Sequence, residues 1–320
     1  MRLRISSRQS DLAQIQALMV ADALKKKHSE LEIEFRFRES LGDRNQTDPL
    51  WKMPERGVFT EDFLADLCTG ETDLVVHSWK DLPTEARAET EIIATLPRAD
   101  ARDLLLFKKS SKNKKSLKIF SSSPRREVNL SPLLPQILPW SVQSLEFTVV
   151  RGNVQTRVRK LLEDPQIDGL IVAKAALDRL LIAPQPQFAP TRDFLKKSFE
   201  KLDWMVLPLS ENPTAAAQGA LAIEIKKNRP DLRKLLAEVN CVKTFQAVQK
   251  ERTLLSNYGG GCHLAIGVHV FYVGDEMGLF TKGKTPQGDF FSRQEILREK
   301  VVANFLPNEL APSYDEIYGS

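Results

Sequence analysis

Residues 119–126, IFSSSPRR, run from a short apolar strand pattern directly into the start of a helix. Pro124 suits the first helical turn, where no backbone N–H is needed, and Ser123 suits the N-cap before it. Hydroxyl and guanidinium groups gather beside the free N–H groups of this helix start, namely those of Ser121, Ser122, Arg125 and Arg126. The stretch therefore predicts a strand–helix junction that cradles a carboxylate or phosphate.

The same strand-to-helix pattern recurs along the chain. Residues 147–150 are followed by RGNVQTR at 151–157, and residues 170–173 by a helical pattern. Near the N-terminus, the strand pattern of Leu3 and Ile5 leads into a helix after Ser10. This alternation predicts an α/β fold. One strand-end arginine is commonplace, but several indicate a ligand with many negative groups; they are Arg8, Arg125, Arg126, Arg151, Arg157 and Arg179.

Residues 74–83, LVVHSWKDLP, form a short apolar strand pattern that ends in polar residues. The carboxyl ends of parallel strands are where α/β sheets bind ligands. His77 is alternatively a structural histidine with its hydrogen bonds satisfied. Lys80 and Asp81 are alternatively an ordinary surface pair.

Residues 257–267, NYGGGCHLAIG, place one cysteine at the end of a glycine loop. Consecutive glycines are disfavoured inside helices and strands and leave a loop without side-chain bulk. A thiol presented in this way is typical of an attachment or nucleophile site. The alternative is that Cys262 is a buried structural cysteine.

The composition sets limits on the class of protein. The chain has 320 residues, which predicts two or three domains. Its 46 basic and 42 acidic residues give a net charge of +4, too balanced to indicate a nucleic-acid partner. The three cysteines are widely spaced, which favours a reducing compartment without a disulfide framework. With no signal-peptide pattern and no apolar run of bilayer length, we expect a cytoplasmic protein without a membrane partner.

Three further segments organise the chain. Residues 97–103 are expected to cross between domains. Residues 180–212 are proline-rich and predicted to be irregular. After Asn240 the pattern changes to one helix followed by strands, which predicts a small α+β domain.

Taken together, the chain resembles the porphobilinogen deaminases, also called hydroxymethylbilane synthases. The resemblance rests on six blocks in order along the whole chain: SRQS at 7–10, VHSWKDLP at 76–83, SSPRR at 122–126, RGNVQTR at 151–157, QGA at 218–220 and GGC at 260–262. Six ordered blocks are much more specific than any one motif.

The resemblance implies two lobes like those of periplasmic binding proteins and a small α+β C-terminal domain. The expected boundaries are residues 1–99 with 213–238 for the catalytic first domain, 100–212 for the second and 239–320 for the third. The second domain would bind carboxylates, and the third would carry the cofactor cysteine.

The resemblance also implies an enzyme. Members of this family are transferases that join porphobilinogen units head to tail and release ammonia, giving hydroxymethylbilane in tetrapyrrole (haem) biosynthesis. A dipyrromethane cofactor, held as a thioether on Cys262, would prime the chain. No metal is expected, the partner is porphobilinogen, and the protein is expected to be a monomer.

Site residues follow from the matching blocks. Asp81 would be the catalytic carboxylate. Cofactor contacts would come from Cys262, Ser10, Ser78, Lys80, Ser121, Ser122, Arg125, Arg126 and Arg151. Substrate carboxylates would be bound by Arg8, Arg126, Arg151, Arg157 and Arg179. A lid loop would include Lys52, Arg56 and Phe59.

The sequence also departs from the family pattern. Phe120 replaces a usual glycine, Pro124 a usual leucine and Ala217 a usual glycine. The lid reads KMPERG at 52–57 instead of a lysine- and glycine-rich pattern. A different class stays open: a non-catalytic two-lobed protein that binds an anionic small molecule. A covalent two-ring adduct would distinguish the enzyme from such a binder.

Overall fold

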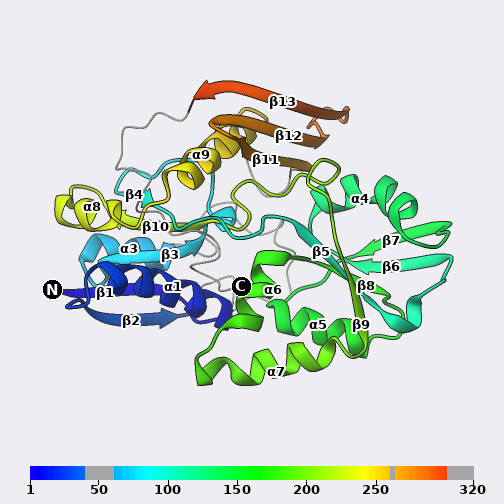
Figure 1. Cartoon of the computed structure of the whole chain (residues 1–320), viewed down its shortest axis with the longest axis horizontal. Helices are drawn as coiled ribbons and strands as arrows, with labels where there is room; N and C mark the ends of the chain where they lie inside the picture. Colours follow the sequence, from blue (N-terminus) through cyan, green and yellow to red (C-terminus); the bar gives the residue numbers. More distant parts are fainter. Residues whose placement is uncertain (40–60, 260–263, 301–320) are drawn as a thin grey trace.

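The computed structural model describes residues 1–39, 61–259 and 264–300, which form three β-sheets (Figure 1). The first sheet has the order β2 (Glu32–Arg38), β1 (Arg2–Arg8), β3 (Leu74–Ser78), β10 (Leu221–Lys226) and β4 (Thr90–Ala94). β1 pairs in parallel with β2 and β3, whereas β10 is antiparallel to both of its neighbours. We call this sheet, with its helices α1, α3 and α8, lobe 1.

The second sheet repeats the same plan. Its order is β7 (Ser144–Thr148), β6 (Ser116–Phe120), β8 (Gly169–Ala173), β5 (Asp103–Lys108) and β9 (Leu202–Val206). β5 is antiparallel to β8 and β9, and β6 is parallel to β7 and β8. We call this sheet, with helices α4 to α7, lobe 2. Each lobe thus receives its single antiparallel strand just after the chain has left the other lobe.

This exchange brings the carboxyl-terminal ends of the parallel strands of both sheets to the same region. In lobe 1, the first residue of β10, Leu221, pairs with Ser78 at the end of β3. In lobe 2, the first residue of β5, Asp103, pairs with Ala173 at the end of β8. The carboxyl ends of the parallel strands therefore face the region where the chain crosses between the lobes, which is where an α/β sheet binds ligands.

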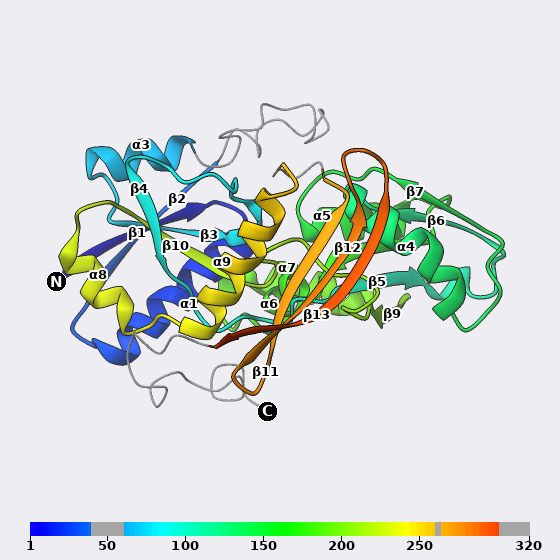
Figure 2. The same cartoon turned by 90° about the horizontal axis from the view of Figure 1, so that it is seen from above.

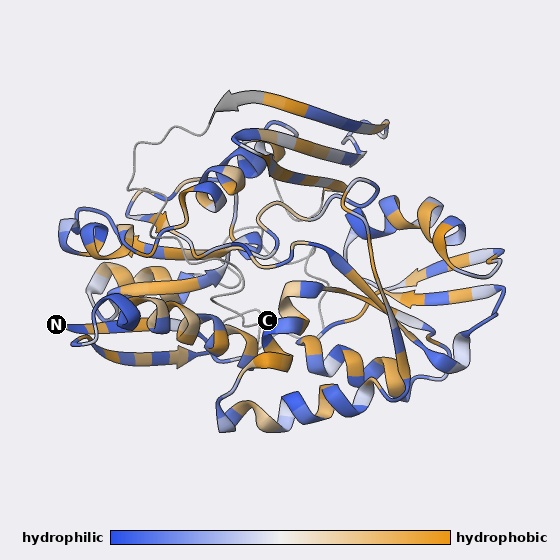
Figure 3. Ribbon diagram, in the orientation of Figure 1, coloured by the Kyte–Doolittle hydropathy of each residue, from blue (hydrophilic) through white to orange (hydrophobic). Residues whose placement is uncertain are grey.

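Helices cover both sheets. Those of lobe 1 are α1 (Asp11–Lys27), α3 (Glu61–Thr69) and α8 (Pro230–Ala237). Those of lobe 2 are α4 (Pro124–Ile137), α5 (Val154–Glu163), α6 (Lys174–Ile182) and α7 (Ala189–Ser198). Short 3₁₀ turns are η2 (Trp79–Asp81), η3 (Lys109–Ser111) and η4 (Pro186–Phe188). Because helices cover its sheet on both faces, the central strand β8 reads GLIVA and all five of its residues are buried. Figure 3 shows the hydropathy of the strands and helices in each lobe.

Helix α1 contributes to the cores of both lobes. Val20 and Leu24 belong to the core of the first sheet, whereas Ile15 belongs to that of lobe 2. Met19 packs against both cores, and α1 contacts α6. One amphipathic helix therefore joins the lobes through apolar packing.

The third sheet has the order β11 (Ile266–Val273), β12 (Glu276–Lys284) and β13 (Phe290–Lys300), and α9 (Val242–Ser256) packs against β11. Figure 2 shows α9 and these strands running across the region between the two lobes. The sheets confirm the predicted fold class: two α/β lobes and a small α+β part.

The prediction of an irregular segment at 180–212 is wrong. It contains the last residues of α6, the whole of helix α7 and the whole of strand β9. Pro190 lies in the first turn of α7 and Pro186 in the first turn of η4, positions that tolerate proline because no backbone donor is lost there. Leu195 and Leu202 then pack in the core of lobe 2. Two of the four prolines in this segment therefore lie at helix starts and do not mark an absence of structure.

Within the described ranges, no helix combines the length and the apolar character needed to cross a membrane.

Candidate functional site

The end of β3 and the turn η2 place Lys80 and Asp81 at the edge of lobe 1. Trp79 is buried and its ring packs against that of Phe245 on α9, and this contact anchors the turn. Lys80 is half-buried and donates its Nζ to Gln218 Oε1 at 3.3 Å, whereas Asp81 is exposed. Ser78 exchanges hydrogen bonds with Gln16 of α1 at 2.9 and 3.1 Å. The turn is thus anchored while its carboxylate stays open to solvent.

His77 is a structural residue. It is buried, and its Nε2 lies 2.9 Å from Glu224 Oε2 on the neighbouring strand β10. The alternative that the sequence left open, a satisfied structural histidine, is the correct one.

The junction of β6 and α4 has the predicted local form. Ser123 is the N-cap of α4, its side chain accepts from the Arg126 N–H, and proline occupies the first helical turn. Ser121 N donates to Thr148 O at 2.9 Å, and Ser122 Oγ accepts from Val150 N at 3.0 Å. The backbone at the end of β6 is therefore held against β7 and the loop after it.

Asp103 is fully buried and is the partner of both arginines of this junction. Its Oδ2 accepts from Arg125 at 2.9 Å and its Oδ1 from Arg126 at 2.7 Å. Arg125 also donates to Asn212 Oδ1 and Pro213 O at 3.1 and 2.9 Å. The two guanidiniums hold the pKa of Asp103 far below its usual range despite burial, which acts in the opposite direction. In this structure Arg125 and Arg126 bind a protein carboxylate, so their expected role toward an external one stays a prediction.

Residues of both lobes share one electrostatic environment. Burial, together with the neighbouring charges of Arg126 and Arg151, lowers the pKa of Arg157 to about 10, and Asp81 of lobe 1 opposes the shift. Burial also lowers the pKa of Lys80 to about 8, opposed by Asp81. Arg157 is held in place by a 2.7 Å hydrogen bond from its Nε to Gly152 O. The edge of lobe 2 is thus rich in positive charge and faces the turn that carries Lys80 and Asp81.

The other predicted site residues that the structure describes lie at the crossing between the lobes or at the start of the chain. Arg179 is buried and donates to Gly219 O at 2.7 Å, at the crossing between the lobes. Arg8 is half-buried at the end of β1. Ser10 is the N-cap of α1, but its side chain makes no capping hydrogen bond. Four predicted residues lie outside the described ranges: Cys262, Lys52, Arg56 and Phe59.

Sequence reasoning gave no role to Asp103, Gln218 or Glu251, which organise this site. Gln218 is buried and donates to Asp103 Oδ1 at 2.9 Å. Glu251 is buried, pairs with Arg98 at 2.6 Å and accepts from Ala217 N at 2.6 Å. One available signal was that Asp103 directly precedes the apolar run 104–107. A charge at the start of a buried strand needs a partner.

The structure describes two of the departures from the family pattern: one is accommodated in a core, and the other places an alanine in a conformation that favours glycine. Phe120 is buried in the core of lobe 2, where its ring fills space beside Leu170. Ala217 has φ +66°, in the left-handed region that favours glycine.

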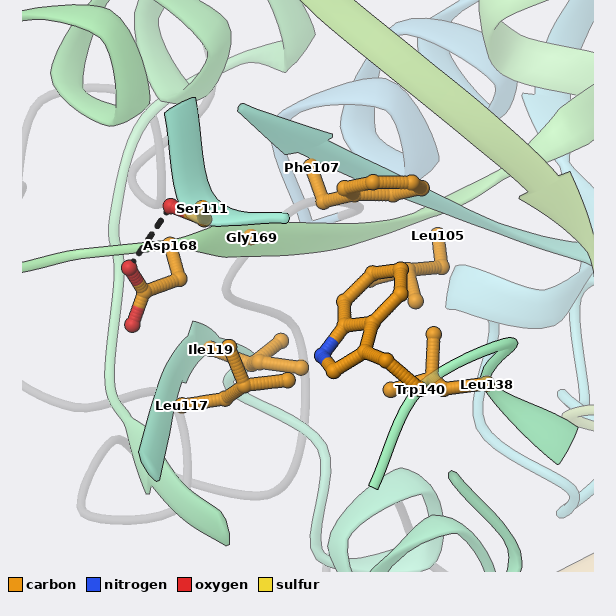
Figure 4. A pocket seen from close by; sticks show the side chains of 9 residues that line it. All are labelled: Leu105, Phe107, Ser111, Leu117, Ile119, Leu138, Trp140, Asp168 and Gly169. Carbon is orange, nitrogen blue, oxygen red and sulfur yellow. Dashed lines mark hydrogen bonds between the residues drawn. The ribbon is translucent and has the colours of Figure 1, made fainter. Parts of the chain in front are cut away.

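Two cavities among the described residues are not lined by Lys80, Asp81 or the arginines of lobe 2. One, of about 10 Å³, lies in lobe 2 and is lined by Phe107, Trp140 and Ile119, among others (Figure 4). It is too small for an organic ligand. The other, of about 540 Å³, is lined by Trp79, Phe245 and Arg252, among others, but not by Lys80 or Asp81. No group of three or more metal-ligating side chains occurs in the described part of the chain.

Comparison with known proteins decides the family. A family model described as "porphobilinogen deaminase, dipyromethane cofactor binding domain" matches residues 3–234, well over half of the chain. The porphobilinogen deaminase of Caldicellulosiruptor saccharolyticus is 32% identical over 313 residues, covering 97% of this chain and 98% of the relative. The chain belongs to the porphobilinogen deaminase family.

Other relatives agree with this assignment. The porphobilinogen deaminase of Trichlorobacter lovleyi is 32% identical over 312 residues, covering 97% of this chain and 92% of the relative. That of Natranaerobius thermophilus is 29% identical over 316 residues, covering 98% and 92%. Among solved structures, the methionine-binding protein MetQ has a TM-score of 0.40 at 11% identity, covering 81% of this chain and 94% of that one.

The described residues fit the cofactor of this family. A dipyrromethane carries acetate and propionate groups, so it needs several cationic donors around two rings. Arg126 acts on both Lys80 and Arg157, and Arg151 also acts on Arg157. The pKa of Arg157 is lowered first by burial and then by these two positive neighbours. Carboxylates are the chemistry that would neutralise such a cluster.

Proposed function

We propose that this protein is a hydroxymethylbilane synthase that joins porphobilinogen units head to tail with release of ammonia, in tetrapyrrole (haem) biosynthesis. The observation that carries the proposal is the shared environment of two groups of residues from different lobes. Lys80 and Asp81 lie at the end of β3, and Arg126, Arg151 and Arg157 lie across from them in lobe 2. A carboxylate and a cationic cluster in one place suit a substrate that is an amine at one end and a polyanion at the other.

We assign Asp81 as the catalytic carboxylate. It is exposed, so it can reach a bound pyrrole, and it would stabilise positive charge that develops on the pyrrole nitrogen as the amine leaves. Lys80 is held beside it by Gln218 and would bind a substrate carboxylate or the leaving group. Burial lowers the pKa of the Lys80 ammonium to about 8, which allows Lys80 to take part in proton transfer near neutral pH.

The carboxylates of substrate and cofactor are assigned to the arginines of lobe 2. Arg151 and Arg157 lie at the start of α5, where free N–H groups add to their charge. Ser121 and Ser122 at the end of β6, Ser78 after β3 and Ser10 at the start of α1 would supply hydroxyl donors. When bound, the dipyrromethane supplies the nucleophilic ring that primes chain growth. Cys262 is assigned as its point of attachment.

The architecture also suggests how the work is divided. We propose three domains: residues 1–99 with 213–238, residues 100–212 and residues 239–320. Support comes from the exchange of β5 and β10 between the two five-stranded sheets and from the separate sheet of β11 to β13. A monomeric, cytoplasmic enzyme remains part of this proposal.

Intact-protein mass spectrometry of the whole purified chain tests the proposal most directly. We expect extra mass equal to one dipyrromethane, located on Cys262 by peptide mapping and lost in Cys262→Ala. Ammonia should be released from porphobilinogen by the parent and not by this variant. A chain of unmodified mass that binds porphobilinogen without releasing ammonia would show instead a non-catalytic binding protein.

A further inference from the structure

Gln218 occupies the point where both lobes and their crossing segments meet. Its side chain is buried, and its Nε2 donates to Ala101 O at 2.7 Å and to Asp103 Oδ1 at 2.9 Å. Its Oε1 accepts from Lys80 Nζ at 3.3 Å. Both ends of one amide are therefore in use, one toward each lobe.

The two partners of this amide belong to different parts of the site. Lys80 is adjacent to Asp81 in the turn after β3 of lobe 1. Asp103 begins β5 of lobe 2 and holds the guanidiniums of Arg125 and Arg126. We propose that Gln218 is a positioning residue that fixes Lys80 of lobe 1 relative to the Asp103–arginine cluster of lobe 2.

The backbone around Gln218 is immobilised by contacts from several elements. Arg98 Nε donates to Gln218 O at 2.8 Å, and Ala217 N donates to Glu251 of α9 at 2.6 Å. Gly219 O accepts from Arg179 of α6 at 2.7 Å. A Cβ on Gly219 would lie 2.5 Å from Ala99 O, so the two crossing segments are also in close contact. A side chain on such a fixed backbone can position its partners precisely, because little of its geometry is free to vary.

The local contacts predict effects of opposite sign for two substitutions. The charged groups that act on Lys80 are Asp81, Asp103, Arg125 and Arg126. Gln218→Met keeps the length of the side chain but removes the acceptor from the ammonium, which favours the neutral amine. Gln218→Glu replaces the Nε2 donor with an oxygen beside Asp103 Oδ1, so the two carboxyl groups share one proton. Part of their shared negative charge then lies beside Lys80, which favours the ammonium.

The test measures Lys80 itself and so does not depend on turnover. The whole protein is acetylated at a series of pH values from 6 to 10, and the modified fraction of Lys80 is read by peptide mass spectrometry. In the parent we expect a midpoint near the pKa of about 8. Gln218→Met should label roughly 2.5- to 5-fold faster than the parent at pH 7, which corresponds to a midpoint lowered by about 0.5 to 1 pH unit. Gln218→Glu should shift the midpoint in the other direction.

Gln16→Met is the matched control. Gln16 is also a buried amide next to this turn, but it bonds to Ser78 and not to Lys80. It should leave the Lys80 midpoint at the parent's value. If Gln218→Met does not fold, as judged by near-ultraviolet circular dichroism, Gln218→Asn replaces it, since the shorter amide cannot span both partners and should shift labelling in the same direction.

Steady-state kinetics connect this positioning role to catalysis. The kinetic part of the test, unlike the labelling, rests on the proposed function. The alkaline limb of kcat/KM should move with the labelling midpoint in each variant. Equal midpoints in the parent, Gln218→Met and Gln218→Glu would overturn the proposal. Shifted midpoints in a chain without deaminase activity would leave the positioning role intact and refute only the proposed function.

Discussion

The two edges that face each other across the site use charge in different ways. In lobe 1, the turn of Lys80 and Asp81 leaves its carboxylate exposed. In lobe 2, the carboxylate of Asp103 is fully buried and satisfied by four donors, from Arg125, Arg126, Asn212 and Gln218. The first arrangement is available to a ligand, whereas the second mainly fixes the arginines and the crossing segments. An arginine at a strand end is therefore not by itself evidence of ligand binding. Whether it can bind a ligand depends on whether a carboxylate of the protein already binds it.

The largest effect is expected at the buried carboxylate. Asp103→Asn should lower the free energy of unfolding by about 3 to 5 kcal/mol, because two buried guanidiniums lose their counter-charge. Urea unfolding measures this. Asp178→Asn, which breaks the surface pair with Lys174, is the control and should cost under about 1 kcal/mol.

The pH dependence provides a second check on Asp103. Its pKa is lowered on folding, so its stabilising contribution is complete above the unfolded pKa of about 3.9 and is lost as pH falls below that value. The difference in stability between the parent and Asp103→Asn should therefore shrink below about pH 4. A difference that stays constant down to pH 2 would show that the charge of Asp103 is not what stabilises the fold.

The exposed carboxylate should behave in the opposite way. Asp81→Asn should reduce kcat by about 100- to 1000-fold, the usual loss for one group that stabilises developing charge. Its thermal midpoint should stay within 1 to 2 degrees of the parent's, roughly the effect of a few tenths of a kcal/mol. Glu85→Gln, at another exposed carboxylate close by in the sequence, is the control for charge alone. A catalytic effect no larger than that of Glu85→Gln would remove Asp81 from the mechanism.

Comparing two arginines sharpens the distinction within lobe 2. Arg151→Leu should raise KM by about 10- to 100-fold with little loss of stability, because a charged hydrogen bond to a ligand contributes about 1.5 to 3 kcal/mol. Arg125→Leu should instead lower the unfolding midpoint, since Arg125 is buried against Asp103, Asn212 and Pro213. Steady-state kinetics and thermal unfolding of both variants separate these outcomes. If Arg151→Leu unfolds as readily as Arg125→Leu, both arginines are structural.

The smallest expected effect concerns the backbone that carries Gln218. Ala217→Gly should raise the free energy of unfolding by about 0.5 to 1 kcal/mol, because glycine adopts a positive φ without strain. Ala220→Gly is the control: Ala220 is buried but has no positive φ, so its replacement should destabilise by a similar amount. Destabilisation by both would show that the methyl group of Ala217 contributes more than its strain costs.

Most of the secondary structure and of the local chemistry could be predicted from the order of the residues alone. The alternation of apolar strands and helix starts predicted the α/β lobes, and the Ser123–Pro124 start of α4 was correct in detail, because both depend on residues adjacent in the chain. Six ordered motifs also identified the family and pointed to Lys80, Asp81 and the arginines of lobe 2. Local signals failed at 180–212, where prolines at helix starts resembled a break in structure.

Which charged groups are exposed and which are paired with each other could not be predicted, because it depends on how distant segments pack. Asp103 accepts hydrogen bonds from Gln218 and Asn212, which are more than 100 residues away in the sequence. His77 lies beside Glu224 on the neighbouring strand β10. No local pattern encodes such pairs, because they depend on how β5 and β10 exchange between the sheets. A charged group that is removed from water must find a partner within the fold. The packing of the two lobes buries Asp103 against its arginine partners, so it stabilises the structure, whereas Asp81 stays exposed.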